Sequence, residues 1–257
     1  MAPRNSVQRL DPRLTDVLND LEGSPVGQAF KDRAVELASS AAFAGPVDYR
    51  ATLRPHLWLL ERAASGGLPL TAAGYLKPAH VREFAAVLPT MRDWIFPMAR
   101  EVDVRPVFHF REYLKLIGLL RKYKGTLRAT TAGKRGVADA ATLWDHLAAT
   151  LVPTASTFAE SAGVVVLIHM ATTEGWIDVD VVARTMTQLG WSRADGSPVV
   201  RDDVYPIWNY LWVALGNVGD VGAWDASAPD AGSHPFDRHL SRDAVALIRT
   251  ALFTEVG

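Results

Sequence analysis

The chain has 257 residues, a formal net charge of −1 and no cysteine. This length allows one large domain or two small ones, and the lack of cysteine excludes disulfides, thiolate catalysis and cysteine-ligated zinc. The longest apolar run, residues 162–170, is far shorter than the roughly 20 residues that span a bilayer, so we expect no membrane segment. The N-terminus lacks the apolar stretch of a secretion signal, which predicts a cytoplasmic protein.

Residues 1–50 predict an N-terminal helical arm. Asp11-Pro12 and Ser24-Pro25 each place proline at a first helical position, directly after a residue that caps helices well. After the second of these starts, apolar side chains recur at the spacing of one helix face, at Phe30, Ala34, Leu37 and Ala41.

Residues 51–150 predict a first structural unit. Its expected elements, in chain order, are a helix at 54–64, a short strand at 67–71, helices at 78–88 and 106–117, a hairpin at 119–130 and a helix that begins near Thr131. In the back half of a winged helix, one helix is followed by two strands joined by a tight turn, and then by another helix. This unit is therefore expected to be a winged helix with the hairpin as its wing.

Residues 151–257 predict a second unit with the same order of elements, although few residues are identical. Its expected elements are a helix at 157–171, a short strand at 175–178, helices at 179–189 and 205–215, a long loop, and a last helix at 239–253. The fold class expected for the whole chain is mainly α, with two tandem winged-helix units and short β-hairpin wings behind the N-terminal arm.

The second unit is less suited to nucleic acid. Between residues 202 and 237 there are six aspartates and no lysine or arginine, so phosphate would be repelled. An aromatic stripe at helical spacing, formed by Tyr205, Trp208 and Trp212, predicts either core or a dimer interface. We therefore expect this unit to serve structure, dimerisation or contact with another protein.

The strongest functional signal is the basic segment 111–136. It contains eight lysine or arginine residues and a single acid, Glu112, so it carries +7 in a chain whose total is −1. A local excess of positive charge on a wing indicates a polyanionic partner, and double-stranded DNA is the partner that we expect.

A family resemblance rests on the same residues. The stretch GLLRKYKGTLRATTAG at 118–133 resembles the wing and exit of winged-helix regulators of the MarR type, except that Ala129 replaces the usual leucine before the capping threonine. LTAAGYLKP at 70–78, followed by this block and by Leu143-Trp144, is similar to an uncharacterised family of plasmid and mobile-element proteins from high-GC bacteria. The resemblance covers residues 50–150 and implies a winged-helix fold rather than an activity.

In a winged helix the third helix enters the major groove and the wing touches the flanking backbone. On the helix at 106–117, His109 and Lys115 are therefore expected to probe the groove, with Arg111 at the border of that face. The expected phosphate contacts on the wing are Arg121, Lys122, Lys124 and Arg128. Palindromic operators need two-fold partners, so a homodimer is expected as well.

The sequence is also compatible with two other functions. The winged helices could act as a scaffold that binds another protein and no DNA, which would fit the acidic second unit. The third choice is a metal-dependent hydrolase, for which His234, Asp237 and His239 are the candidate ligands, although their spacing matches no zinc pattern. No catalytic motif occurs in the chain, so we predict no enzyme activity, no cofactor and no metal site.

Overall fold

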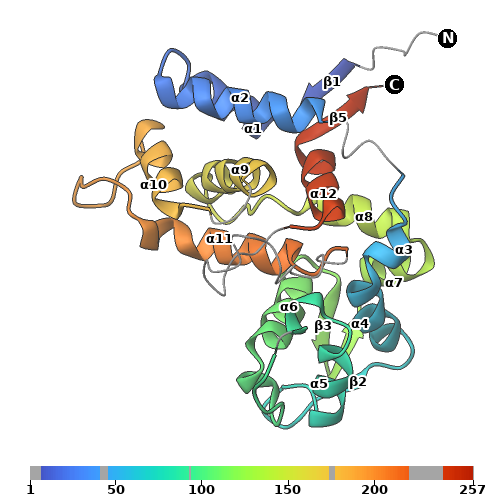
Figure 1. Cartoon of the computed structure of the whole chain (residues 1–257). Helices are drawn as coiled ribbons and strands as arrows, with labels where there is room; N and C mark the ends of the chain where they lie inside the picture. Colours follow the sequence, from blue (N-terminus) through green and yellow to red (C-terminus); the bar gives the residue numbers. More distant parts are fainter. Residues whose placement is uncertain (1–6, 41–45, 93, 174–176, 220–239, 257) are drawn as a thin grey trace, which may run out of the picture. The chain divides into compact units, whose positions relative to one another are not determined.

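The computed structural model describes residues 7–40, 46–92, 94–173, 177–219 and 240–256. Within these ranges the protein is mainly helical, as predicted, with twelve α-helices, a three-stranded antiparallel sheet and a two-stranded one (Figure 1). No helix in the described ranges is long and apolar enough to cross a membrane. Contacts divide the chain into a first unit of Met1–Gly45, Leu151–Leu211 and Trp224–Gly257, and a second unit of Pro46–Thr150 and Trp212–Ala223.

The first unit is built around one buried helix. Its helices are α1 (Pro12–Asp20), α2 (Pro25–Ser39), α9 (Thr157–Thr172), α10 (Val179–Gln188), α12 (Arg242–Leu252) and most of α11 (Arg201–Leu215). All residues at 162–170 in α9 are buried, and α1, α2, α10 and α12 pack on this helix. The segment that we expected as a separate arm thus clusters in one unit with the C-terminal half of the chain, because α9 offers it an apolar surface.

The helix starts predicted at Asp11 and Ser24 are confirmed. The Asp11 carboxylate accepts the N–H of Arg13 at 2.9 Å, and the Ser24 hydroxyl accepts the N–H of Gly27 at 2.9 Å. In each case the proline that follows occupies a position where no backbone hydrogen bond is lost. Local capping chemistry is therefore sufficient to begin these two helices.

The two ends of the described chain form a sheet of their own. Strand β1 (Val7–Leu10) pairs antiparallel with β5 (Phe253–Val256), so that Leu10 lies opposite Phe253. The N–H of Asp11 extends this ladder by donating to the carbonyl of Leu252 at 2.9 Å. The sequence analysis missed both strands because four-residue strands carry little local signal and the partner lies at the other end of the chain.

The second unit contains the elements predicted for residues 54–138. Its helices are α3 (Tyr49–Thr52), α4 (Arg54–Ala64), α5 (Pro78–Ala85), α6 (Arg105–Leu116), α7 (Thr131–Ala138) and α8 (Ala140–Ala149), with 3₁₀ turns η2 (Pro89–Met91) and η3 (Glu101–Asp103). Its strands are β2 (Leu68–Pro69), β3 (Leu120–Tyr123) and β4 (Thr126–Ala129), arranged in the order β2-β4-β3 with both pairings antiparallel.

The passage from α6 into the hairpin is set by a glycine. Gly118 follows the end of α6 with φ of +76°, a conformation that favours glycine. The N–H of Leu119 then donates to the carbonyl of Leu114 at 2.9 Å, the 6→1 bond of a Schellman motif. Because this motif reverses the chain directly after α6, the orientation of the hairpin is tied to that of the helix.

The predicted strand-to-helix signature at 127–133 is also confirmed. The Thr130 side chain accepts the N–H of Gly133 at 3.1 Å and so caps α7. A β-carbon on Gly133 would lie 2.3 Å from the carbonyl oxygen of Leu119, which is too close for any other residue. Glycine is needed here because the backbone of α7 passes directly beside the chain that enters β3.

Two turns in the described chain share the same geometry. The turn 71–75 between α4 and α5 is closed by the bridge Leu70↔Leu76, and the turn 193–197 between α10 and α11 is closed by Ser192↔Pro198. Each turn has the same two backbone hydrogen bonds, between 2.8 and 2.9 Å long, and a glycine with positive φ at its fourth position. One of these turns lies between α4 and α5 and the other between α10 and α11, whereas the predicted repeat pairs the segment 54–64 with 157–171.

The four helices predicted for the second winged helix are seen as α9, α10, α11 and α12, but its strand and hairpin are not seen among the described residues. Of the strand expected at 175–178, residues 175–176 lie outside the described ranges, and Ile177 and Asp178 are not in a strand. Residues 220–239, which include most of the predicted long loop, also lie outside those ranges. A second winged helix is therefore not shown by the described residues.

Candidate nucleic-acid interface

Strands β3 and β4 form a hairpin that is closed by the two residues Lys124 and Gly125. Both have positive φ, +46° and +71°, as a type I′ turn requires. Asparagine and glycine are the residues that favour the first of these positions, whereas lysine is strained there. Among the described residues, Lys124 alone combines a side chain other than that of glycine with a positive φ.

Strand alternation divides the hairpin into two faces. Leu120, Leu127 and Ala129 point inward and are buried in the core of the unit. Arg121, Tyr123 and Arg128 lie on the other face and are exposed, and Arg121 stands directly opposite Arg128 in the ladder. Like charges in directly opposed positions destabilise a strand pair, so this arrangement does not arise from the needs of the fold.

Lys122 differs from the other wing cations because it lies on the inward face. Its ammonium group extends over the turn 71–75, where a β-carbon on Gly74 would lie 2.6 Å from the Lys122 Nζ atom. Lys122 nevertheless remains exposed. Positive charge is thus presented beside the hairpin as well as on its outer face.

The wing cations are not neutralised by acids within the described part of the chain. Arg121, Lys122, Lys124 and Arg128 form no ion pair with any carboxylate there. Lys134 and Arg135, in α7, are exposed and likewise form no ion pair with a described carboxylate. We had not selected these two residues from the sequence, although they belong to the same basic segment.

The exposed face of α6 lies in the helix that precedes the hairpin. His109 is exposed on it, and burial together with the nearby Arg105 guanidinium lowers the pKa of His109. Lys115 is bound to Glu112, with 2.7 Å between Nζ and Oε2, so its charge is largely neutralised locally. Arg105 was not among the predicted residues, because the helix was expected to begin at Pro106, whereas α6 begins one residue earlier.

Arg111 does not lie on this face. Its side chain is 3% exposed, and its Nε atom is 2.6 Å from Oε1 of Glu101, which is fully buried. The spacing of Arg111 from Val107 and Leu114 places it within the buried stripe of α6, so the position itself could have been recognised. Its partner Glu101, ten residues upstream, could not have been recognised from the sequence. This placement removes Arg111 from the candidate interface.

Glu101 has a second hydrogen-bond partner besides Arg111. Its Oε2 atom accepts the N–H of Leu76 at 2.6 Å, which links η3 and α6 to the end of the turn 71–75. Burial raises the pKa of Glu101, while the Arg111 guanidinium and the Leu76 N–H oppose that rise. The ion pair thus ties together the segments that position α6.

The predicted aromatic stripe in α11 is not a single surface. Tyr205 is 51% exposed and stacks on Trp208 with 5.6 Å between ring centroids, whereas Trp212 is only 8% exposed. The division between the two units falls between Leu211 and Trp212. Trp212 is therefore removed from the expected interface, and Tyr205 remains its accessible member.

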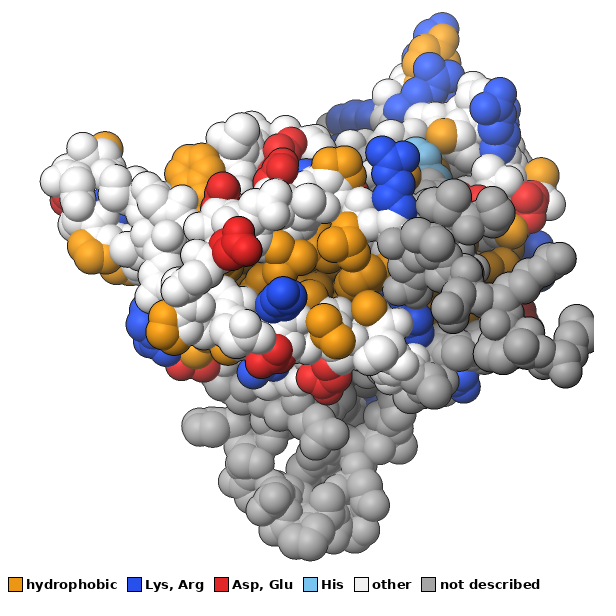
Figure 2. Space-filling view, turned by 90° about the horizontal axis from the view of Figure 1, so that it is seen from above, with side chains coloured by type: hydrophobic (Ala, Val, Ile, Leu, Met, Phe, Trp, Pro, Cys, Tyr) orange, Lys and Arg blue, Asp and Glu red, His pale blue; other side chains and the backbone are white. Residues whose placement is uncertain are grey.

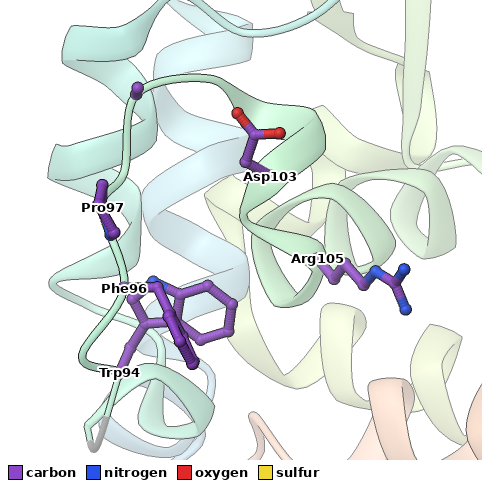
Figure 3. Close-up of a pocket in the computed structure, with 6 residues that line it drawn as sticks. Trp94, Phe96, Pro97, Asp103 and Arg105 are labelled. Carbon is purple, nitrogen blue, oxygen red and sulfur yellow. The ribbon is translucent and has the colours of Figure 1, made fainter.

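The described residues support a metal site or a small-ligand site less well than they support the basic hairpin. The described residues include no cluster of three or more histidines or carboxylates placed to hold a metal ion, and His234, Asp237 and His239 lie outside them. An open hollow of about 430 Å³ is lined by Trp94, Phe96, Pro97, Ala99, Asp103 and Arg105. Asp103 is bound to Arg100 at 2.8 Å, and the Arg105 side chain runs away from the two aromatic rings (Figure 3). The polar groups do not converge, so the hollow has no evident chemistry.

The charged side chains of the protein are unevenly distributed. On the face shown in Figure 2, acidic and basic side chains are mixed around a hydrophobic area, while lysine and arginine side chains gather at the upper right. The hairpin and the exposed face of α6 together make the candidate interface of the second unit. Comparison of the chain with family models, with curated proteins and with solved structures found no match.

Proposed function

We propose that the second unit is a winged-helix domain that binds double-stranded DNA. The order α4, β2, α5, α6, β3, β4 and the strand order β2-β4-β3 support this proposal, because they place a helix directly before a two-stranded wing. Helix α6 would face the major groove with Arg105 and His109. Arg121, Lys122, Lys124 and Arg128 would contact the phosphates. The likeness of α10–turn–α11 to α4–turn–α5 supports a partial second copy that serves protein contact.

The proposal rests mainly on one observation. Cations of the wing that form no ion pair in the described structure occupy positions that lower the stability of the DNA-free protein. A residue other than glycine at positive φ costs about 1–3 kcal/mol, and an opposed pair of like charges costs up to about 1 kcal/mol. A polyanion would offset the second cost by neutralising Arg121 and Arg128. Phosphates spaced along a duplex meet this requirement, and they also reach Lys124 at the tip of the hairpin.

Charge removal from the wing should abolish most of the salt dependence of DNA binding. With four phosphate contacts, log affinity should fall against log salt with a slope of roughly −3.6, so binding should weaken roughly 150-fold between about 50 and 200 mM salt. The variant R121Q/K122Q/K124N/R128Q should bind weakly with a slope near zero. The measurement is fluorescence anisotropy with a labelled duplex across a salt series.

Two single variants make this test specific. K124N removes one charge but supplies the residue that the turn favours, so it should reduce the slope by about 1 while the hairpin stays folded. K31Q removes an exposed cation from α2 in the first unit and should leave the slope unchanged. Equal affinity and equal slope for the wild type and the fourfold variant would refute the proposed function.

The first unit supports a second candidate function, protein contact through Tyr205. A half-exposed aromatic ring stacked on a second ring is typical of interface residues, and a homodimer is the partner that a palindromic DNA site requires. Y205S should raise the dimer dissociation constant at least tenfold in sedimentation equilibrium, as expected for a central interface aromatic. A wild-type protein that stays monomeric at every concentration would refute the dimer.

A further inference from the structure

The outer face of the wing carries an aromatic ring among its cations. Tyr123 is 42% exposed, and the charged groups of Arg121, Lys124 and Arg128 lie 5.5, 5.4 and 5.5 Å from the centre of its ring. Within the described ranges, none of these three cations forms an ion pair with a carboxylate. The ring is thus surrounded by positive charge at the end of a hairpin.

The three cations lie 5.4–5.5 Å from the centre of the Tyr123 ring, which is farther than a directly stacked cation. A covered ring occurs elsewhere in the same unit: the Arg62 guanidinium lies 3.6 Å from the centre of the Trp58 ring, and Trp58 stacks on Phe84 at 5.1 Å. There both neighbours lie within stacking range, which is an arrangement for packing. Around Tyr123 the cations are nearly 2 Å farther away than Arg62 is from Trp58. Because Tyr123 is 42% exposed and no cation lies at stacking distance, part of its surface is open to another planar group.

We propose that Tyr123 is a stacking site for an unpaired DNA base, with Arg121 and Arg128 binding the phosphates on either side. This inference rests on the proposed DNA binding and narrows its substrate. A base inside an intact duplex is already stacked on its neighbours and presents only its edges. A base in a single-stranded gap exposes its ring face, and cations beside an aromatic ring are the combination that single-strand binding proteins use.

The inference predicts a preference for DNA that contains unpaired bases. Stacking of one base on an aromatic side chain strengthens binding by roughly 5- to 150-fold, so a gapped duplex should bind at least about fivefold more tightly than the intact duplex. The probes are one labelled duplex, the same duplex with a short single-stranded gap, and the gap strand alone. Affinities are compared by anisotropy at one salt concentration.

Variants of Tyr123 separate stacking from charge. Y123F and Y123W keep an aromatic ring and should keep the preference for the gap, whereas Y123L should bind gapped and intact DNA equally. Affinity for the intact duplex should change less than about threefold in all three variants, because the phosphate-binding cations are retained. A 2-aminopurine placed in the gap should be quenched by the wild type and not by Y123L.

The outcomes distinguish this inference from the proposed function. Equal wild-type affinity for gapped and intact duplex, or a gap preference that persists in Y123L, would overturn the stacking site and leave duplex binding in place. A wild-type protein that binds none of the three probes would overturn both proposals. The comparison of probes with the wild-type protein decides the inference even where a variant does not fold.

Discussion

Replacing Glu101 with glutamine should lower the free energy of unfolding of the second unit by about 3–5 kcal/mol, the usual cost of leaving one member of a buried ion pair without its partner. Arg111 is 3% exposed and cannot be deprotonated, so its charge would remain in the core. Glu112, 3.1 Å from Arg111 and partly exposed, would compensate only in part. Urea unfolding followed by far-UV circular dichroism measures the loss.

A double substitution provides the matched control. In E101L/R111M both charges are removed, and apolar side chains take their place in a site that is already buried. Replacing a buried ion pair in this way is often neutral or stabilising, so the double variant should be more stable than E101Q. A cost below about 1 kcal/mol for E101Q, or a double variant as unstable as the single one, would show that the pair is not the main tie between η3 and α6.

Acidification from pH 8 to pH 5 should destabilise each unit by about 2 kcal/mol, because each unit contains a buried histidine that resists protonation. Burial lowers the pKa of His56 in the second unit to about 3. In the first unit, burial lowers the pKa of His169 to about 4, with a further lowering from Arg33 and an opposing effect from Asp178. The two histidines belong to different units.

The sign follows from which state binds the proton. Above pH 6.5 both histidines are neutral in the folded and the unfolded chain, so neither makes stability depend on pH. Below pH 6.5 the unfolded chain takes up protons while the folded one does not, which costs about 1.4 kcal/mol per pH unit for each histidine. For His56 this continues to about pH 3 and for His169 to about pH 4, where the folded forms also protonate.

The two histidines serve as controls for one another. His56 is fully buried, its ring nitrogens have no hydrogen-bond partner in the described structure, and it meets Phe110 edge to face at 4.8 Å. H56F should therefore preserve packing and remove the pH dependence of the second unit, and H169F should do the same for the first. Thermal unfolding across a pH series measures both slopes, and a stability that stays constant between pH 8 and pH 5 would contradict the prediction.

The candidate site was predictable where its signals are local. Lys124-Gly125 between two short strands marks a tight turn, and the density of cations in residues 111–136 marks the surface that presents them. Which of those cations reach solvent was not predictable in every case. Arg111 and Lys115 belong to the same run of charge, yet one is buried against Glu101 and the other is bound to Glu112.

The sequence by itself determined the positions of α4, α5, α6 and the hairpin of the second unit, and the start of α7. The N-terminal helix starts at Asp11 and Ser24 were equally readable, since capping residues, prolines and apolar spacing act within a few residues. Tertiary structure alone decided that the strands β1 and β5 pair and that the N-terminal helices pack on α9. Those features depend on contacts between residues far apart in the chain, and no local pattern specifies which distant surface a helix face or a strand edge will meet.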